Sequence, residues 1–167
     1  TNLSPRPLIL PWLEITQEEE ETISSDGIFS YFPEPILPEA GFFIIGGWYD
    51  LDLMDKEEKG RWTGANALSL FRNPYKKSLL KIEGQVSHWA LEVQKAPQVQ
   101  IFLNGFRLDS FIPQDQRFVR ELILEPGNLG NSQWCELSFV VDKTIVPHQY
   151  EHSGDKRNLG IKITNIQ

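Results

Sequence analysis

Short stretches of alternating apolar and polar residues, separated by turn residues, run from Gly41 to the end of the chain. In "QVQIFLNG", Val99, Ile101 and Leu103 alternate before an Asn-Gly turn, the pattern of a strand that enters a hairpin. "FVRELILEP", "WCELSFVVD" and "LGIKITNI" keep the same period of two, and "KSLLKIEGQVSHWALEV" offers one or two further strands. With no helical period between them, these stretches predict an all-β fold: about eight antiparallel strands in a two-sheet, jelly-roll-like β-sandwich.

The composition changes near residue 40. Residues 1–40 are acidic and rich in proline, with "QEEEET" and "FPEPILPEAG", and are interpreted as a linker or a segment that wraps onto the body through Phe29, Ile36 and Leu37 among others. Residues 41–167 are interpreted as one β-sandwich module, which is long enough to bury a core without disulfides. The first residue is not methionine, and prolines interrupt any signal-peptide core, so the chain is expected to be a piece of a longer protein.

Charge and cysteine content limit the classes of partner and the compartment. The net charge of -7, with scattered basic residues, argues against nucleic acid, which requires clustered Lys and Arg. No apolar run approaches the roughly 20 residues that span a bilayer. The single cysteine, Cys135, lies in an apolar alternation and is predicted to be a small buried side chain. A reducing, cytoplasmic location is favoured.

No pattern in the sequence predicts a catalytic or metal centre. His148 and His152 are four residues apart, but no HExxH motif or Cys pair accompanies them, so no transition-metal site is predicted. A structural calcium ion at a sandwich edge is the one candidate cofactor. There is no GxSxG elbow and no glycine-rich phosphate loop. The chain is therefore predicted not to be an enzyme; a small hydrolase or lyase would need a cleft lined by His148, His152 and Asp155.

Aromatic and planar charged side chains gather at the predicted strand ends. Sugar recognition uses such residues, because an aromatic ring packs on a pyranose face while Arg and Asp bind its hydroxyls. The candidate carbohydrate-binding residues are Trp48, Tyr49, Arg61, Trp62, Asp155 and Arg157. In the alternative interpretation, Trp48 and Trp62 fill the core and Arg61 pairs with Asp155 to fix a loop.

An ordered set of short motifs carries a family resemblance: "GWY", then "RWTG" before "NALSLF", then "VQIFLNG", "LILEP" and "DKRNLGIKITNI". Over residues 41–167 the chain resembles a β-sandwich module found beside glycosyltransferase and methyltransferase domains in bacterial surface-polysaccharide proteins, similar in outline to jelly-roll carbohydrate-binding domains. The resemblance implies a glycan partner and a neighbouring catalytic domain. It also implies an acidic residue between the first two motifs, for which the candidates are Asp50, Asp52, Asp55, Glu57 and Glu58.

Residues and resemblance together predict a non-catalytic carbohydrate-binding or accessory module of a larger glycan-modifying protein in polysaccharide biosynthesis. The alternative is a structural or protein-interaction β-sandwich that docks on a catalytic neighbour or on a second copy of itself. The two hypotheses differ in whether the aromatic rings and Arg61 are exposed or used inside the fold.

Overall fold

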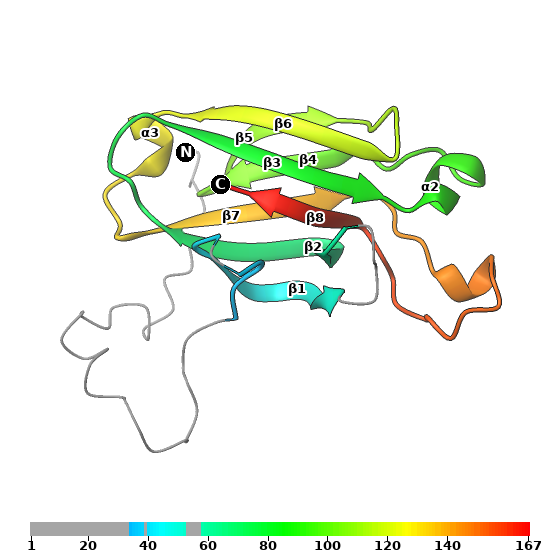
Figure 1. Cartoon of the computed structure of the whole chain (residues 1–167). Helices are drawn as coiled ribbons and strands as arrows, with labels where there is room; N and C mark the ends of the chain where they lie inside the picture. The colour runs from blue at the N-terminus through cyan, green and yellow to red at the C-terminus, as the bar shows by residue number, and fades with distance from the viewer. Residues whose placement is uncertain (1–33, 39, 53–57) are drawn as a thin grey trace, which may run out of the picture.

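The computed structural model describes residues 34–38, 40–52 and 58–167, which form a twisted, mostly antiparallel β structure (Figure 1). The strands are β1 (Phe42–Asp52), β2 (Gly60–Arg72), β3 (Ser78–Val86), β4 (Val99–Leu103), β5 (Phe106–Phe111), β6 (Arg117–Leu124), β7 (Trp134–Val141) and β8 (Ile161–Ile166). The helices are α2 (His88–Glu92), α3 (Pro126–Leu129) and the 3-10 turn η2 (Pro147–Gln149). None of the helices in these ranges is long and apolar enough to cross a membrane.

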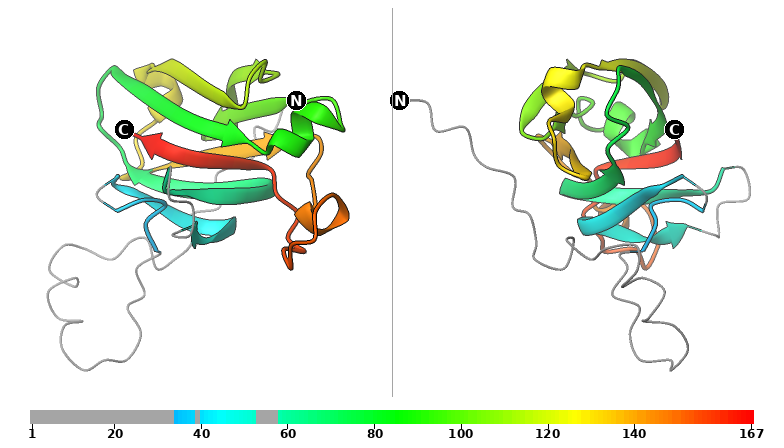
Figure 2. Two further views of the ribbon diagram at one scale, coloured as in Figure 1. Left: turned by 45° about the vertical axis from the view of Figure 1, so that its right-hand side comes forward. Right: turned by 90° about the vertical axis from the view of Figure 1, so that its left-hand side faces the viewer.

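The strands form one continuous sheet that curls into a nearly closed barrel (Figure 2). Its order is β5-β4-β7-β2-β8-β3-β6, with β1 paired to β2, and every pairing is antiparallel. The prediction of an all-β antiparallel fold with about eight strands is thus confirmed. The two-sheet jelly-roll arrangement is not confirmed, because the described strands belong to a single sheet.

Alternation along the strands places the apolar residues inside the barrel. In β7 the buried positions Cys135, Leu137, Phe139 and Val141 alternate with partly exposed ones, as the period of two requires. The burial of Cys135 was predicted, and it raises the pKa of its thiol. The hairpin predicted at Asn104-Gly105 joins β4 to β5, and both residues have positive φ, 49° and 82°. This geometry suits an Asn-Gly pair.

One segment predicted as strand is helical. The stretch "SHWALEV" alternates in hydrophobicity, yet residues His88–Glu92 form α2. A five-residue run is too short for its period to separate strand from helix. The turn of helix covers one end of the barrel, where Ala90 is buried beside Ile145 and Leu159 of the long connection after β7.

The barrel is not closed by hydrogen bonds between β5 and β6. Among the described strands, β5 pairs with β4 and β6 with β3, so the two strands meet only through side chains. Asp109 of β5 and Arg120 of β6 form a two-pronged ion pair, with N···O distances of 2.6 and 3.0 Å. Phe111 and Phe118 contact edge-to-face, with ring centroids 5.2 Å apart. We call this side-chain closure the seam.

Residues 34–38, which we call the strap, lie along the outer edge of β1. Pro35 forms a bridge with Phe43, and Ile36 donates its backbone N–H to the carbonyl of Phe42 at 2.8 Å. Ile36 and Leu37 are buried. Of the predicted wrapping segment 1–40, the part before residue 34, including Phe29, lies outside the described residues.

Candidate functional site

Arg61 is a buried cation whose hydrogen bonds go mainly to backbone carbonyl groups. Its side chain enters the fold from β2, and the residue is 2% exposed. Nε donates to the carbonyl of Ile36 at 2.9 Å, Nη1 to that of Tyr49 at 2.9 Å, and Nη2 to that of Pro35 at 3.3 Å. Nη2 also binds the Glu34 carboxylate at 2.8 Å. The guanidinium therefore fastens the strap to strands β1 and β2.

The expected pairing of Arg61 with Asp155 is wrong. The carboxylate that Arg61 binds belongs to Glu34, in the segment that had been set apart as a linker. Asp155 instead accepts both arms of the Arg157 fork, at 2.9 and 2.7 Å. The guanidinium of Arg157, two residues further along the loop, binds both oxygens of the Asp155 carboxylate. The carboxylate is therefore already hydrogen-bonded within its own loop and does not extend to β2.

Trp48 is half-buried and packs against the main core of the fold. Its indole Nε1 donates to the carbonyl of Leu68 at 3.0 Å. The ring lies edge-on to the buried Phe139, with centroids 5.7 Å apart, and packs against the main core. The hydrogen bond and the aromatic contact hold the Trp48 ring in place against the core.

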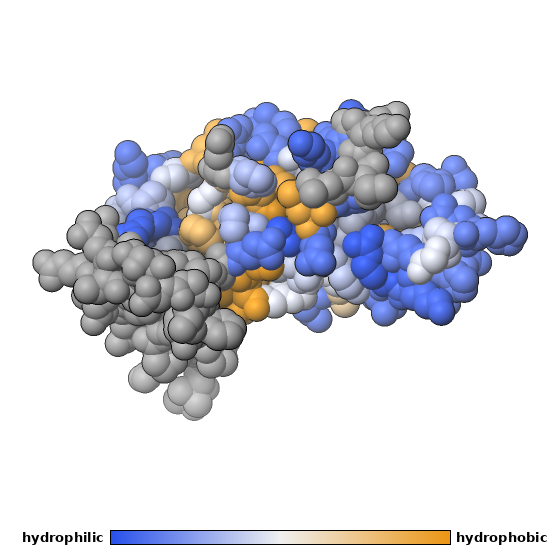
Figure 3. All heavy atoms as spheres, turned by 60° about the horizontal axis from the view of Figure 1, so that its bottom comes forward, coloured by the Kyte–Doolittle hydropathy of each residue, from blue (hydrophilic) through white to orange (hydrophobic). Residues whose placement is uncertain are grey.

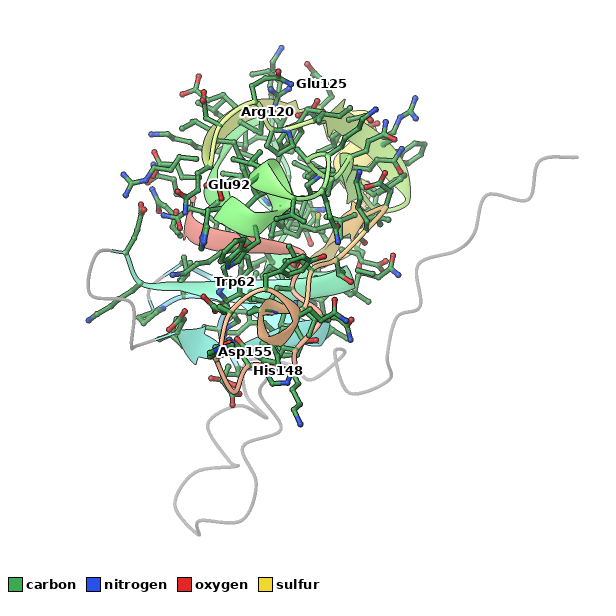
Figure 4. The ribbon with its side chains drawn as sticks, turned by 90° about the vertical axis from the view of Figure 1, so that its right-hand side faces the viewer. Trp62, Glu92, Arg120, Glu125, His148 and Asp155 are labelled. Carbon is green, nitrogen blue, oxygen red and sulfur yellow. The ribbon has the colours of Figure 1, made fainter. Side chains whose placement is uncertain are left out.

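Trp62 and Tyr49 form part of a second, smaller core at one end of the barrel. Figure 4 shows Trp62 between α2 and the loop that carries His148 and Asp155. Trp62 and Tyr49 pack with Trp89 and Tyr150 against buried Ala90, Ile145 and Leu159. The rings of Trp89 and Tyr150 stack at 5.9 Å. This cluster attaches the long connection after β7 to the barrel, so its aromatic residues stabilise the fold.

Tyr49, Asp155 and Arg157 are the predicted binding residues that come together near the surface. The guanidinium carbon of Arg157 lies 5.3 Å from the centre of the Tyr49 ring. The Tyr49 hydroxyl accepts the backbone N–H of Asn158 at 3.2 Å. Hydrogen bonding to Arg157 holds the pKa of the Asp155 carboxyl below its usual value. The Arg157 side chain is 36% exposed and that of Asp155 25%.

The three residues that the hydrolase alternative requires, His148, His152 and Asp155, lie on the loop after β7. Nδ1 of His148 faces the carbonyl of Ser153 at 2.7 Å, and the Asp155 carboxylate is bound by Arg157. His148 and His152 are both exposed. Within residues 34–38, 40–52 and 58–167, no group of three or more His, Cys, Asp and Glu side chains is placed to hold a metal ion.

Two of the acidic residues between the first two family-like motifs surround a buried lysine. Lys162 of β8 is 1% exposed, and its ammonium group donates to the carbonyl of Glu58 at 2.7 Å. A carboxylate oxygen of Asp52 lies 3.7 Å from the same nitrogen. Of these two residues, Asp52 faces the lysine with its carboxylate, whereas Glu58 offers its backbone carbonyl and pairs its carboxylate with Arg117 at 3.1 Å. Asp55 and Glu57 lie outside the described residues.

A surface that the sequence analysis missed lies on the outer face of β3 and β6. Leu79 and Ile123 are cross-strand partners, and they are 55% and 49% exposed. Four residue pairs further along the β3–β6 ladder, and on the same face, Val119 is 55% exposed. The alternation in these strands did predict a solvent-facing side. The alternation did not indicate that this solvent-facing side would carry apolar residues.

A groove of about 370 Å³ adjoins the strap at the end of β8. It is lined by Leu37, Pro38, Ala40, Lys59, Thr164, Asn165, Ile166 and Gln167. Apolar surface gathers near the middle of the lower face of the molecule, whereas the end with the loop after β7 is hydrophilic (Figure 3). The groove contains one cation, Lys59, and no described carboxylate.

Comparison with models of protein families and with curated protein sequences finds no match for this chain.

Proposed function

We propose that this chain is a non-catalytic β-barrel interaction domain that docks on a second copy of itself through the outer face of β3 and β6. The observation that carries the proposal is the distribution of exposed apolar side chains. Five of the seven large apolar residues that are exposed in the described ranges lie on β3, β5, β6 or the turn after β5: Leu79, Phe106, Ile112, Val119 and Ile123. Such concentration on one side of a domain is typical of an interaction surface.

Oppositely charged side chains lie on this face, and within one copy the ammonium group of Lys81 binds the Glu83 carboxylate at 2.8 Å, so a second copy would share this lysine with Glu83. Lys81 and Glu121 are cross-strand partners, next to the Leu79 and Ile123 pair. A two-fold axis between β3 and β6, parallel to both strands, would set Leu79 opposite Ile123 of the second copy and Lys81 opposite its Glu121. An isologous interface requires such self-complementarity. Because the face is small, we expect weak association, with a Kd of roughly 10 µM to 1 mM.

The test is a concentration series of sedimentation velocity on the chain and its variants. Ile123→Lys should abolish association, whereas Val93→Lys, which changes an equally exposed valine at the end of α2, should not. Lys81→Glu should weaken the dimer, and adding Glu121→Lys should restore it. A chain that stays monomeric at millimolar concentration would refute the proposal. If the double variant Lys81→Glu/Glu121→Lys does not dimerise again, this orientation of the two copies is refuted.

The glycan-binding function that the sequence favoured is a second candidate, and it is supported by Tyr49, Asp155 and Arg157. These three residues lie together at the barrel end with partly exposed planar groups. Isothermal titration with bacterial polysaccharides tests it. Arg157→Ala should weaken binding without changing the dimer. Absence of heat at millimolar sugar would leave docking as the sole candidate.

A further inference from the structure

We propose that the barrel has a binding site for an extended acidic peptide and that the strap occupies this site in cis. The site consists of the Arg61 guanidinium, the outer edge of β1, and the core position that Ile36 fills. Its ligand class is a segment that pairs with β1 around one bridge and then bends, with an acidic residue two positions before a β-branched aliphatic one. In this chain that segment is Glu34-Pro35-Ile36-Leu37.

Arg61 recognises the backbone of the strap more than its side chains. It donates to the carbonyl groups of Ile36 and Pro35 at 2.9 and 3.3 Å. A third bond to the carbonyl of Tyr49, at 2.9 Å, orients the guanidinium from the β1 side. Any extended peptide offers the same carbonyl groups, so this contact does not depend on the strap being part of the same chain.

The strap pairs with β1 in the way that an added strand pairs with a sheet edge. The N–H of Ile36 bonds the carbonyl of Phe42, and the N–H of Ile44 bonds the carbonyl of Glu34, both at 2.8 Å. Between them, Pro35 forms the bridge with Phe43. Proline has no N–H and is therefore suited to the outermost position of a sheet. This arrangement is the strand-addition mode of peptide recognition.

Side chains at two positions add selectivity. Ile36 is fully buried among the core residues, and Leu37 is 8% exposed. The Glu34 carboxylate binds Nη2 of Arg61 at 2.8 Å. Pro35 and Pro38 restrict the backbone before and after the buried pair, which lowers the entropy lost when the segment is fixed. The pattern of acid, proline and aliphatic residues matches each feature of the site.

Because the strap precedes β1 directly, it competes with any free peptide at a high effective concentration. For short tethers this concentration is about millimolar or more. A free peptide should consequently bind only when the strap is weakened. A competing segment of another protein and the strap of a second copy present the same chemistry, and the mass of the complex distinguishes them.

The test uses the full chain carrying Ile36→Ser, which removes the buried side chain of the strap and keeps Arg61. A fluorescent peptide of sequence EPILP, blocked at both ends, is titrated and followed by anisotropy. We expect binding at least tenfold tighter to the variant than to the unchanged chain. The matched peptide EPSLP should bind at least tenfold more weakly than EPILP. QPILP should bind two- to threefold more weakly, because the Glu34 position is exposed to solvent.

Two results would overturn the inference: no binding of EPILP to the folded variant at millimolar concentration, or equal binding of EPILP and EPSLP. If Ile36→Ser prevents folding, EPILP should restore a cooperative thermal transition measured by circular dichroism, and failure to restore it counts equally against the site. Dimer formation through β3 and β6 involves none of these contacts. A negative peptide result therefore leaves the sedimentation test unaffected.

Discussion

Replacing Arg61 with alanine tests whether backbone carbonyl groups or the ion pair account for its stabilising effect. The substitution leaves the carbonyl groups of Ile36, Pro35 and Tyr49 without the donor that each now has. An unsatisfied buried polar group costs about 1–3 kcal/mol. Partial access of water to Pro35 and Tyr49 reduces that sum. We therefore expect Arg61→Ala to lower the free energy of unfolding by about 3–4 kcal/mol.

The ion pair with Glu34 should contribute much less. The Glu34 side chain is 59% exposed, and an ion pair with one partner in solvent is worth about 0.5 kcal/mol after screening. Glu34→Gln is the matched control, since it removes the charge and keeps the shape. Arg61→Lys should be intermediate, because one ammonium group cannot reach three carbonyl groups in the geometry of the fork.

Urea unfolding of the unchanged chain and the variants measures these differences. The ordering Arg61→Ala, then Arg61→Lys, then Glu34→Gln, from most to least destabilising, is the expected result. If Glu34→Gln costs as much as Arg61→Ala, charge pairing dominates and the carbonyl argument is wrong. A cost below about 1 kcal/mol for Arg61→Ala would show that the strap does not depend on the guanidinium.

Two further predictions concern the loop after β7 and its junction with β8. Gly160→Ala would place a Cβ 2.5 Å from the carbonyl oxygen of Gly64. We expect it to lower the free energy of unfolding, measured in urea, by about 1–3 kcal/mol. Gly154→Ala is the control and should be nearly neutral, because nothing lies within 4 Å of the added Cβ. Because Arg157 lowers the folded-state pKa of Asp155, their interaction stabilises the fold above about pH 4 and is lost as the pH falls through that lowered pKa. Asp155→Asn should thus flatten the dependence of the melting temperature on pH below about pH 4, and an unchanged slope would contradict this assignment.

The strands and the β4–β5 hairpin could be predicted from the sequence because their signals are local. The alternation from Cys135 to Val141 directly specifies which side chains of β7 face inward. Asn104 and Gly105 specify their turn through the positive φ angles that they tolerate. Closure of the sheet into a barrel was not predictable in the same way. It depends on β2 pairing with β7 along Asn66–Arg72 and with β8 at Arg61 and Trp62, a register that no local pattern contains.

The partner of Arg61 was missed for a related reason. The expected partner was a carboxylate within the β module, Asp155, whereas three of the four hydrogen-bond acceptors of Arg61 are backbone carbonyl groups. A carbonyl group is present at every residue and leaves no compositional signal. The apolar residues Ile36 and Leu37 in the proline-rich segment predicted that this segment packs on the body, but nothing in the sequence connected it with Arg61.

Residue types that suit a ligand are informative only when their hydrogen-bonding groups remain available. Arg61 and the indole of Trp48 are used internally, and the fork of Arg157 is occupied by Asp155. Internal hydrogen bonds of this kind must be broken before an external ligand can form its own, which removes most of the gain from binding. The apolar side chains of Leu79, Val119 and Ile123 on the outer face of β3 and β6 carry no hydrogen-bonding group, so covering them breaks no internal hydrogen bond; Lys81 on the same face is the exception, because it is already bound to Glu83. For that reason the face around Leu79 and Ile123 is a stronger candidate for binding than the aromatic residues from which a glycan site was first predicted.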